Sequence, residues 1–371
     1  MAKNKNRREV NSPAVTVTEK IPLVSVIIPM YNAANFIPQT LESLLNQTMT
    51  DFEVVAVDDC STDKSVEVVE NFAERFGGRL HVVKLAKNTG MPYLPRNVGI
   101  NFACGKYLAF MDNDDFFTKT ALAELTTLAE KFQADVINIS RVFNMPDNGE
   151  DLNALLASVN QKINALYESG SLNLQKVIEL PEDLAKRVQI WVNDGFQRGT
   201  WAWFCKRDFW IANQISFPQM PVSDDTIANF ACVCLAKKLI IAPNLVYIYR
   251  HRAESISREK DDVGNFIHKW VSNLTLGFKA LEEIMARINF FNEHPDYRYA
   301  VLNWFFKAGI SDAKNFPATY ARIHSAVLNQ FVAKEFSGDD AAFAAYLFNT
   351  VNVQQLQIMR LNQELAKFQK H

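Results

Sequence analysis

The sequence lacks the marks of several protein classes. No stretch reaches the roughly 18 consecutive apolar residues of a membrane-spanning helix, and no apolar block follows the basic start as in a secretion signal. The five cysteines are odd in number and form no C-x-x-C pair, so neither a disulfide framework nor a zinc site is predicted. We therefore expect a cytoplasmic protein with reduced cysteines.

The chain also has almost no net charge. Lys and Arg number 39, Asp and Glu number 41, and the formal net charge is -2 over 371 residues. Nucleic-acid binding depends on clustered cations that release counterions, so no nucleic-acid partner is expected. Residues 1–20 are polar and carry Lys3, Lys5, Arg7 and Arg8. They predict a flexible basic N-terminal tail, either a solvated leader or a weak contact with an anionic membrane.

Both common glycine-rich phosphate loops are missing. Neither G-x-x-x-x-G-K-[ST] nor G-x-G-x-x-G occurs in the chain. A phosphate-binding site in this protein would therefore depend on a metal ion and on isolated cations.

What the sequence does contain is an alternation of short apolar runs and amphipathic segments. The first runs, 23–28 and 52–57, flank a helical pattern over 35–47. Further strands are predicted at 80–85, 107–111 and 136–139, and further helices at 63–76, 96–103 and 118–132, the last capped by Thr118. This rhythm predicts an α/β fold, a sheet with helices packed on its faces.

The pattern changes after residue 140. Residues 144–200 are irregular and helical, and we interpret them as an insertion over one sheet edge. A helix at 225–237 and a strand at 239–242 follow, and residues 256–371 are predicted as a helical C-terminal region. The last helix has an apolar seam formed by Ile358, Leu361, Leu365 and Phe368. Docking on the core, formation of a homodimer and peripheral membrane contact all remain open for this seam.

Polar side chains follow nearly every predicted strand. In an open parallel sheet, ligands bind outside the carboxyl ends of the strands. The segments at these ends are 29–32, 58–63, 87–90 and 112–115. They are rich in carboxylates and amides, which predicts a polar ligand site at this edge.

Three carboxylates lie close together after one apolar strand. Asp112, Asp114 and Asp115 would repel one another without a cation. Magnesium and manganese are held by one or two carboxylates together with substrate phosphates. We therefore predict a divalent metal, Mn²⁺ or Mg²⁺, with Asp112 and Asp114 as ligands. The alternative is that these acids cap the following helix.

Other strand-end residues suit a nucleotide. Asp58 and Asp59 can accept from the N–H groups of a base or from ribose hydroxyls, and we assign Asp59 to the base and Asp63 to a helix cap. Arg96 is a cation suited to phosphate oxygens. The candidate nucleotide-binding residues at this rim also include Asn88, Asp112 and Asn113.

The motifs resemble, in order and spacing, those of the family-two glycosyltransferases of GT-A fold. The matching segments are 24–32, 57–63, 96–100 and 105–115. The resemblance implies a GT-A (Rossmann-like) mixed sheet flanked by helices over residues 21–255, and a nucleotide-diphosphosugar donor, usually a UDP-sugar. It also implies inverting transfer to a hydroxyl of a glycan or lipid-linked glycan in bacterial surface polysaccharide synthesis, at the inner face of the cell membrane.

The resemblance also implies roles for single residues. Pro29 and Tyr31 would line the nucleotide, and Asp112 and Asp114 would form the D-x-D motif around ribose, diphosphate and metal. The later acidic motif of the family corresponds to residues 224–225, with Asp225 as the general base. Contacts to the diphosphate or the acceptor are implied for Asp115, Trp201, Asp224, Arg250, His251 and Arg252. The chain departs from the family pattern in having Asp224 in place of Glu and Arg252 where a His is usual.

Two other functions remain open. One is a non-catalytic scaffold that binds a nucleotide-sugar, and the other is a sugar nucleotidyltransferase. The second class normally has a basic, glycine-rich loop after the first strand, and residues 29–32 contain neither glycine nor a basic side chain.

Overall fold

The computed structural model describes residues 21–146, 177–251 and 272–312, with isolated positions at 161, 165, 357, 360, 361 and 367. The predicted tail (1–20), Arg252 and most of the predicted C-terminal region lie outside the described residues. About half of the predicted insertion at 144–200, which the family resemblance marks as the acceptor region, lies outside them as well. Of the apolar seam, Leu361 alone is described, as helical and exposed.

The centre of the fold is a mixed eight-stranded sheet in the order β3-β2-β1-β4-β9-β6-β10-β8. Its strands are β1 (Val24–Met30), β2 (Phe52–Asp58), β3 (Leu80–Lys84), β4 (Tyr107–Phe110), β6 (Val136–Ile139), β8 (Ile178–Glu179), β9 (Trp203–Lys206) and β10 (Leu239–Ala242). A second sheet, β5-β11-β7, consists of β5 (Phe116–Phe117), β11 (Tyr247–His251) and β7 (Phe143–Pro146). The α/β class and the mixed sheet expected from the sequence are confirmed.

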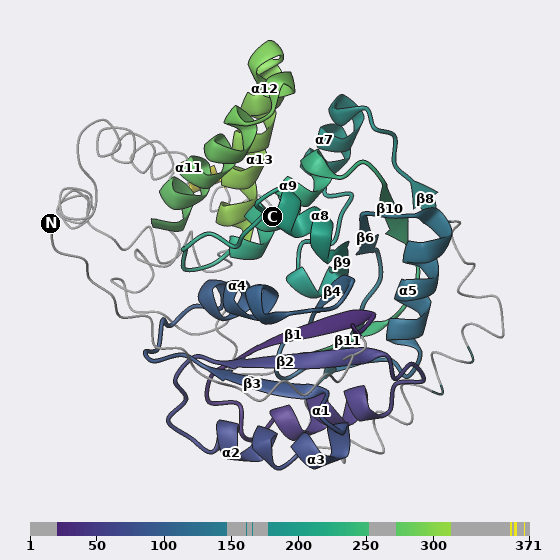
Figure 1. Cartoon of the computed structure of the whole chain (residues 1–371). Coiled ribbons are helices and arrows are strands. Elements are labelled where there is room, and N and C mark those ends of the chain that lie inside the picture. Colours follow the sequence, from purple (N-terminus) through teal and green to yellow (C-terminus); the bar gives the residue numbers. More distant parts are fainter. Residues whose placement is uncertain are drawn as a thin grey trace, which may run out of the picture.

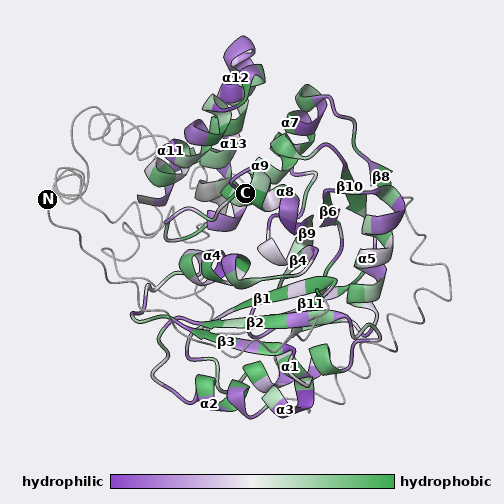
Figure 2. Cartoon of the chain, in the orientation of Figure 1, coloured by the Kyte–Doolittle hydropathy of each residue, from purple (hydrophilic) through white to green (hydrophobic). Residues whose placement is uncertain are grey.

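The strands at the centre are buried on both faces. Every residue of β1 and β2 is buried, and Figure 2 shows these strands as mostly hydrophobic. Continuous β-branched runs of this kind are typical of parallel strands covered by helices on both sides. In Figure 1, α1, α2 and α3 lie on one side of the β3-β2-β1 part and α4 lies on the other.

The helices of the described residues fall into two groups. Those around the sheet are α1 (Ile37–Leu45), α2 (Ser65–Glu70), α3 (Ala73–Phe76), α4 (Tyr93–Phe102), α5 (Ala121–Phe132), α7 (Leu184–Val192), α8 (Arg207–Ala212) and α9 (Asp224–Leu235). A second group, α11 (Ser272–Ala286), α12 (Asn289–Glu293) and α13 (Pro295–Asp312), packs on α7 and α9. Among the described helices, none is long and apolar enough to cross a lipid bilayer.

Strand β9 interrupts the series of parallel strands that the sequence predicts. It runs antiparallel between β4 and β6, with Cys205 opposite both Leu108 and Val136. The sequence pattern did not reveal this strand because it has only four residues and its partners lie about a hundred and about seventy residues earlier in the chain. Local periodicity cannot identify such distant pairing.

Two predicted helix boundaries were wrong. The helix predicted at 63–76 is two short helices, α2 and α3, separated after Glu70. Thr118 does not cap α5, which begins at Ala121 after Thr120. The backbone N–H of Thr118 instead donates to the carbonyl of Val246 at 2.9 Å, so Thr118 connects the end of β5 to the segment before β11.

Arg187 of α7 is a buried cation that closes the C-terminal end of α9. Its guanidinium donates to the carbonyls of Pro181, Val233 and Ala236, and to that of Lys237 at 3.1 Å. Burial lowers the pKa of Arg187. Carbonyls at a helix C-terminus carry partial negative charge, so this cation compensates the end of α9 opposite to Asp224 and Asp225.

Replacing Arg187 should destabilise the protein strongly. Arg187→Met leaves several buried carbonyls without a donor, and each costs about 1–3 kcal/mol. We expect a loss of several kcal/mol in the free energy of unfolding, measured by urea denaturation. The matched control is Lys186→Met on the exposed side of the same helix, which should shift the midpoint little. Equal midpoints for the two variants would contradict the role of Arg187.

Candidate active site

The loops after β1 and β2 are joined by hydrogen bonds. Asn32, in a left-handed conformation with φ 48, accepts from the N–H of Thr62 at 2.9 Å and donates its own N–H to Ser61 Oγ at 2.9 Å. Asp63 accepts from the N–H groups of Ala34 and Ser65. Burial alone would raise the pKa of Asp63, but the bonds from Ser65 and Ala34 lower it. Asp63 is therefore a structural residue just before α2, but the N-cap position of this helix is Lys64 and not, as the sequence predicted, Asp63.

Asp59 lies beneath the loop that follows β3. It is 4% exposed, and its carboxylate accepts from the N–H and hydroxyl of Thr89 and from the N–H of Gly90 at 3.2 Å. In this structure Asp59 orders the loop that carries Asn88, and direct contact of either residue with a base stays a prediction. Tyr31, at 44% exposed, is open to a ligand, whereas Pro29 is buried.

The D-x-D loop after β4 is held from two sides. Asn113 donates from its side chain to the carbonyl of Pro29 at 2.9 Å, and the N–H of Asp112 donates to Tyr247 Oη at 3.1 Å. The side chains of Asp112 and Asp114 are partly exposed at this rim. The loop thus connects β1 to β11 and presents two carboxylates outward.

Asp115 points into the protein, which contradicts its predicted contact with diphosphate or acceptor. It is fully buried and accepts from Tyr247 Oη at 2.7 Å and from the N–H of Arg250 at 2.8 Å. Burial and the nearby charges of Asp112 and Asp114 raise the pKa of Asp115 well above its usual range. The sequence could not show this because neighbouring loop residues can face opposite ways.

Arg96 of α4 bridges the two acidic motifs. Its guanidinium lies 2.9 Å from Asp224 Oδ2 and 3.4 Å from Asp112 Oδ1, and it stacks over the ring of Phe217 at 5.4 Å. Burial would lower the pKa of Arg96, but Asp224 and Asp112 raise it. The predicted phosphate contact of Arg96 is therefore corrected, since this buried cation pairs with carboxylates. Asp224, 4% exposed, is likewise a partner of Arg96 and not an open contact for the acceptor.

Asp225 is the half-buried carboxylate at the start of α9. Its Oδ1 accepts from the N–H of Thr226 at 2.7 Å. Burial and the charges of Asp224 and Asp112 raise the pKa of Asp225 to about 6, although Arg96 and the Thr226 N–H oppose the shift. A carboxylate with a raised pKa beside the D-x-D loop is suited to take up a proton near neutral pH.

Arg250 and His251 of β11, which were predicted to contact the diphosphate or the acceptor, have partners within the protein. The Arg250 guanidinium packs over the rings of Phe116 (4.7 Å) and Phe36 (5.6 Å) and donates to Gln39, and its phosphate contact stays a prediction. His251 lies 3.0 Å from Asn144 Oδ1, between β11 and β7. Its contact with diphosphate stays a prediction.

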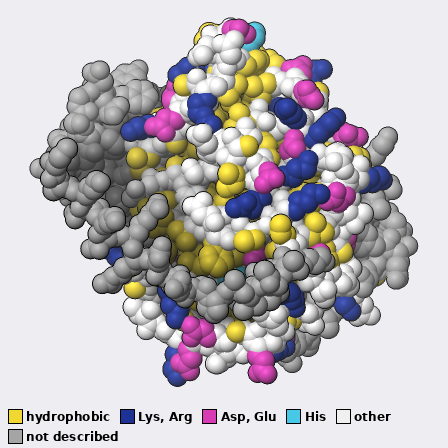
Figure 3. Space-filling model, in the orientation of Figure 1, with side chains coloured by type: hydrophobic (Ala, Val, Ile, Leu, Met, Phe, Trp, Pro, Cys, Tyr) yellow, Lys and Arg dark blue, Asp and Glu magenta, His cyan; other side chains and the backbone are white. Residues whose placement is uncertain are grey.

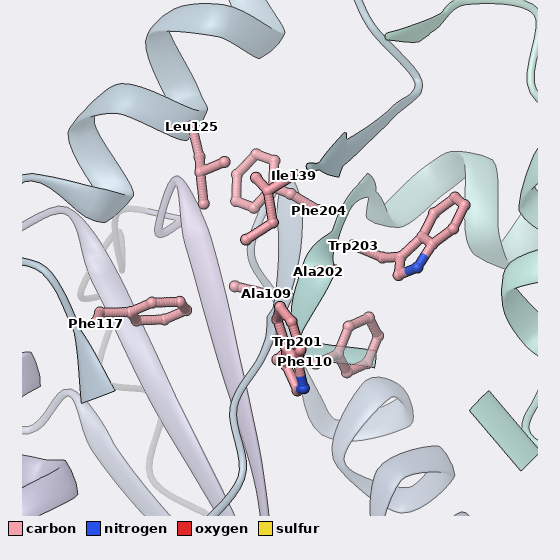
Figure 4. Close-up of a pocket in the computed structure, with 9 residues that line it drawn as sticks. All are labelled: Ala109, Phe110, Phe117, Leu125, Ile139, Trp201, Ala202, Trp203 and Phe204. Carbon is pink, nitrogen blue, oxygen red and sulfur yellow. The ribbon is translucent and has the colours of Figure 1, made fainter. Parts of the chain in front are cut away.

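Trp201 forms a wall between the rim and a small internal void. Its ring stacks on Tyr247 with centroids 4.8 Å apart. The void measures about 10 Å³, close to the volume of one water probe, and apolar side chains such as Phe110, Phe117 and Phe204 line it (Figure 4). It therefore offers no polar chemistry.

On the face in Figure 3, the charged side chains of the described residues form no patch of one sign. Lys and Arg side chains are interspersed there with Asp and Glu side chains.

The carboxylates at the rim meet the needs of a divalent metal only in part. Among the residues that the structure describes, no group of three or more His, Cys, Asp or Glu side chains is arranged to hold a metal ion. Asp115 is turned inward and Asp112 is paired with Arg96. Asp112 and Asp114 together fit the lower limit for Mg²⁺ or Mn²⁺, which complete their coordination with water and phosphate oxygens.

Sequence reasoning missed the residues that hold the site together. Tyr247 fixes the D-x-D loop, and Asn97 pairs with the backbone of Phe217 through bonds of 2.8 and 3.0 Å. The one signal for Asn97 is its place directly after Arg96. No local signal marks Tyr247 because its partners lie more than 130 residues earlier in the chain.

Comparison with known proteins places this site in a family. The family model "Glycosyl transferase family 2" matches residues 25–202. Residues 25–202 of the chain belong to the family-two glycosyltransferases. This confirms the family resemblance that the motifs predict.

Two of the relatives that the chain resembles illustrate the extent of the sequence similarity. The uncharacterized glycosyltransferase EpsJ of Bacillus subtilis is 29% identical over 238 residues, which is 64% of this chain and 63% of EpsJ. The poly(ribitol-phosphate) beta-N-acetylglucosaminyltransferase TarS of Staphylococcus aureus is 39% identical over 117 residues, 31% of this chain and 20% of TarS. The matches therefore span less than two thirds of either relative.

The structural similarity to TarS covers more of this chain than the sequence similarity does. The crystal structure of TarS 1–349 in complex with UDP superposes with a TM-score of 0.56 at 18% identity, covering 90% of this chain and 88% of the TarS chain. The likeness establishes a shared fold, which includes elements beyond the part matched by the family model.

Removing the hydroxyl of Tyr247 should loosen the D-x-D loop. Tyr247→Phe leaves the N–H of Asp112 without its partner and removes one of the two hydrogen bonds that the Asp115 carboxyl accepts, so we expect a loss of about 1–3 kcal/mol in stability and weaker nucleotide binding. Thermal unfolding and UDP titration measure the two effects. Tyr297→Phe, which removes a hydroxyl with one long bond of 3.4 Å to Gln189, is the control and should change neither. Unchanged UDP affinity in Tyr247→Phe would refute the supporting role.

Proposed function

We propose that this protein is an inverting glycosyltransferase that moves a sugar from a nucleotide diphosphate donor, a UDP-sugar, to a hydroxyl of a glycan or glycolipid acceptor. The observation that carries the proposal is the Arg96 bridge, which holds the D-x-D loop and the start of α9 on one guanidinium. This arrangement keeps a donor-side carboxylate and a general base in fixed relation. Membership of family two and the fold shared with TarS support the same reaction class.

The proposed reaction is a single displacement. Asp225 accepts the proton of the acceptor hydroxyl while that oxygen attacks the anomeric carbon of the donor sugar. The bond from the anomeric carbon to the phosphate oxygen breaks, and the nucleoside diphosphate leaves with the electron pair. The configuration at the anomeric carbon inverts, and no covalent sugar–enzyme intermediate is needed.

The donor diphosphate is proposed to lie at Asp112 and Asp114 with a divalent ion. When bound there, Mn²⁺ or Mg²⁺ neutralises charge on the leaving diphosphate. Asp112 is oriented for this role by Arg96, while Tyr31, exposed after β1, lies open at the rim for the nucleoside.

A calorimetric titration of UDP tests the donor site. We expect UDP to bind in the presence of Mn²⁺, binding to weaken at least tenfold on chelation with EDTA, and GDP to bind more weakly than UDP. Preference for GDP would change the donor class. Binding of UDP without hydrolysis or transfer of any UDP-sugar would favour the non-catalytic scaffold instead.

The pH dependence of the reaction follows from Asp225. A general base acts in its ionised form, and the pKa of Asp225 is raised to about 6. We therefore expect kcat/KM to be constant above about pH 7 and to fall about tenfold per pH unit below about pH 6. A steady-state pH profile measures this fall of kcat/KM at acidic pH. Binding of a stable donor analogue over the same pH range is the control. A rate that stays constant down to pH 4.5 would remove Asp225 from the role of base.

The acceptor and the place of the reaction in the cell are proposed from the family resemblance. The acceptor is a surface polysaccharide or its lipid-linked precursor, made at the inner face of the bacterial membrane, with the N-terminal tail as a weak membrane contact. A homodimer through the seam near Leu361 stays a prediction, which sedimentation at micromolar concentration tests.

A further inference from the structure

The turn that precedes the base carries backbone strain. Ser223, directly before α9, has φ 65, a left-handed conformation that costs a residue with a side chain about 1 kcal/mol or more. Serine at this position usually caps the helix with its hydroxyl, but Ser223 makes no side-chain cap to α9. The conformation that sets the direction of Asp224 and Asp225 therefore needs support from elsewhere.

A buried amide on another helix supplies that support. Asn273 of α11 is 1% exposed. Its Oδ1 accepts from the N–H of Val222 at 3.3 Å, and its Nδ2 lies 3.5 Å from Ser223 Oγ. Both functional groups of this side chain are thus directed to the two residues that precede the acidic pair.

The approach of α11 to this turn is close along its length. Gly277, one helical turn after Asn273, lies where a Cβ would overlap the Phe305 ring of α13 and stand 3.3 Å from Met220 Cε. Met220 is buried in the segment leading to Ser223. The absence of a side chain at 277 lets α11 sit close to α13 (Figure 1) and to the segment that begins at Met220.

We propose that Asn273 is a positioning residue for the general base: through the 222–223 turn it fixes the direction and the desolvation of Asp225. The inference rests on the proposed role of Asp225. Arg96 holds the acidic pair from the α4 side and Asn273 holds the turn from the α11 side. Helix α11 therefore supports the position of the base, although it lies beyond the stretch matched by the family model.

The test compares Asn273→Ala with a matched loss of a buried amide. The control is Gln47→Ala: Gln47 is 6% exposed, follows α1 at the far side of the sheet, and bonds to the backbone at Ser43, Thr118 and Leu122. With thermal stability measured for both, we expect Asn273→Ala to lower kcat at pH 8 at least tenfold, because small displacements of a catalytic group are costly. UDP affinity should change less than about twofold. Gln47→Ala should keep its kcat per folded molecule.

The second readout is the titration of Asp225, followed by carbon-13 NMR and independent of activity. Opening of the turn admits water, so the pKa of Asp225 should fall from about 6 toward the ordinary value of 3.8 in Asn273→Ala and less so in Ser223→Ala. If Asn273→Ala does not fold, the same measurements are made on Ser223→Ala, which removes only one hydroxyl, and they decide whether the turn positions Asp225.

The outcomes separate this inference from the proposed function. An active wild type with unchanged kcat and Asp225 titration in both variants overturns the role of Asn273. Loss of UDP affinity equal to the loss of kcat also overturns it, since the effect would then be general disruption. A wild type without transfer or donor hydrolysis overturns the proposed function, and the NMR titration still decides whether Asn273 controls Asp225.

Discussion

Asp225→Asn should lower kcat by about a thousandfold and leave UDP affinity within about twofold of the wild type. A general base contributes about 10²- to 10⁴-fold to a reaction of this kind. The amide has the shape of the carboxylate and can still accept from the N–H of Thr226, so the start of α9 should keep its geometry. Initial rates with saturating donor and calorimetric binding of UDP measure the two quantities separately.

The same substitution should raise thermal stability above pH 6. The pKa of Asp225 is higher in the folded protein (about 6) than its ordinary value of 3.8, so the fold disfavours the ionised form and loses stability as pH rises through this range. The neutral amide avoids that cost. Asp208→Asn, an exposed acid in the first turn of α8, is the matched control and should change neither rate nor stability. An Asp225→Asn enzyme with full activity would exclude Asp225 as the base.

Arg96→Met should be the most destabilising substitution at the site. Removing one partner of a buried ion pair costs about 3–5 kcal/mol because the remaining charge is left uncompensated. Here Asp224, 4% exposed, loses its 2.9 Å partner, and Asp112 loses an orienting cation. We expect this loss in the free energy of unfolding from urea denaturation, together with loss of metal-dependent UDP binding.

A double-mutant cycle assigns the loss of stability to the buried charge. Arg96→Met combined with Asp224→Asn should recover part of the stability lost in Arg96→Met alone, since the uncompensated carboxylate is gone. The matched control is Arg75→Met, which breaks the exposed pair with Glu42 and should leave the unfolding midpoint unchanged. Additive effects of Arg96→Met and Asp224→Asn would show that the pair is not coupled and would refute the bridge.

The strand ends were predictable from sequence because a buried strand has a local signature. The apolar runs at β2 and β4 end where the polar segments begin, so local pattern was enough to place Asp59 and Asp112 at this edge, whereas Asp225 was identified only through the family resemblance. The direction in which each side chain points was not predictable. Asp114 and Asp115 are neighbours in one loop, yet the first is partly exposed and the second is fully buried against Tyr247.

The cations show the same limit. Arg96 and Arg250 are basic residues near the predicted rim, and both were expected to contact phosphate. Arg96 is instead neutralised by Asp224 from a helix 128 residues later, and Arg250 is packed between two phenylalanine rings. Whether a cation is free for a ligand depends on which distant side chains reach it first.

The sequence by itself determined the α/β class, the edge of the sheet where polar groups gather, and the acidic motifs of a family-two glycosyltransferase, because these depend on hydrophobic periodicity and short-range spacing. Tertiary structure decided the insertion of β9 between β4 and β6, the Arg96 bridge, the inward turn of Asp115 and the support of the base turn by Asn273. Each of these joins residues at least about 16 positions apart, and most join residues 50 to 130 apart. The free energy of such contacts depends on the burial and charge that only the folded chain creates.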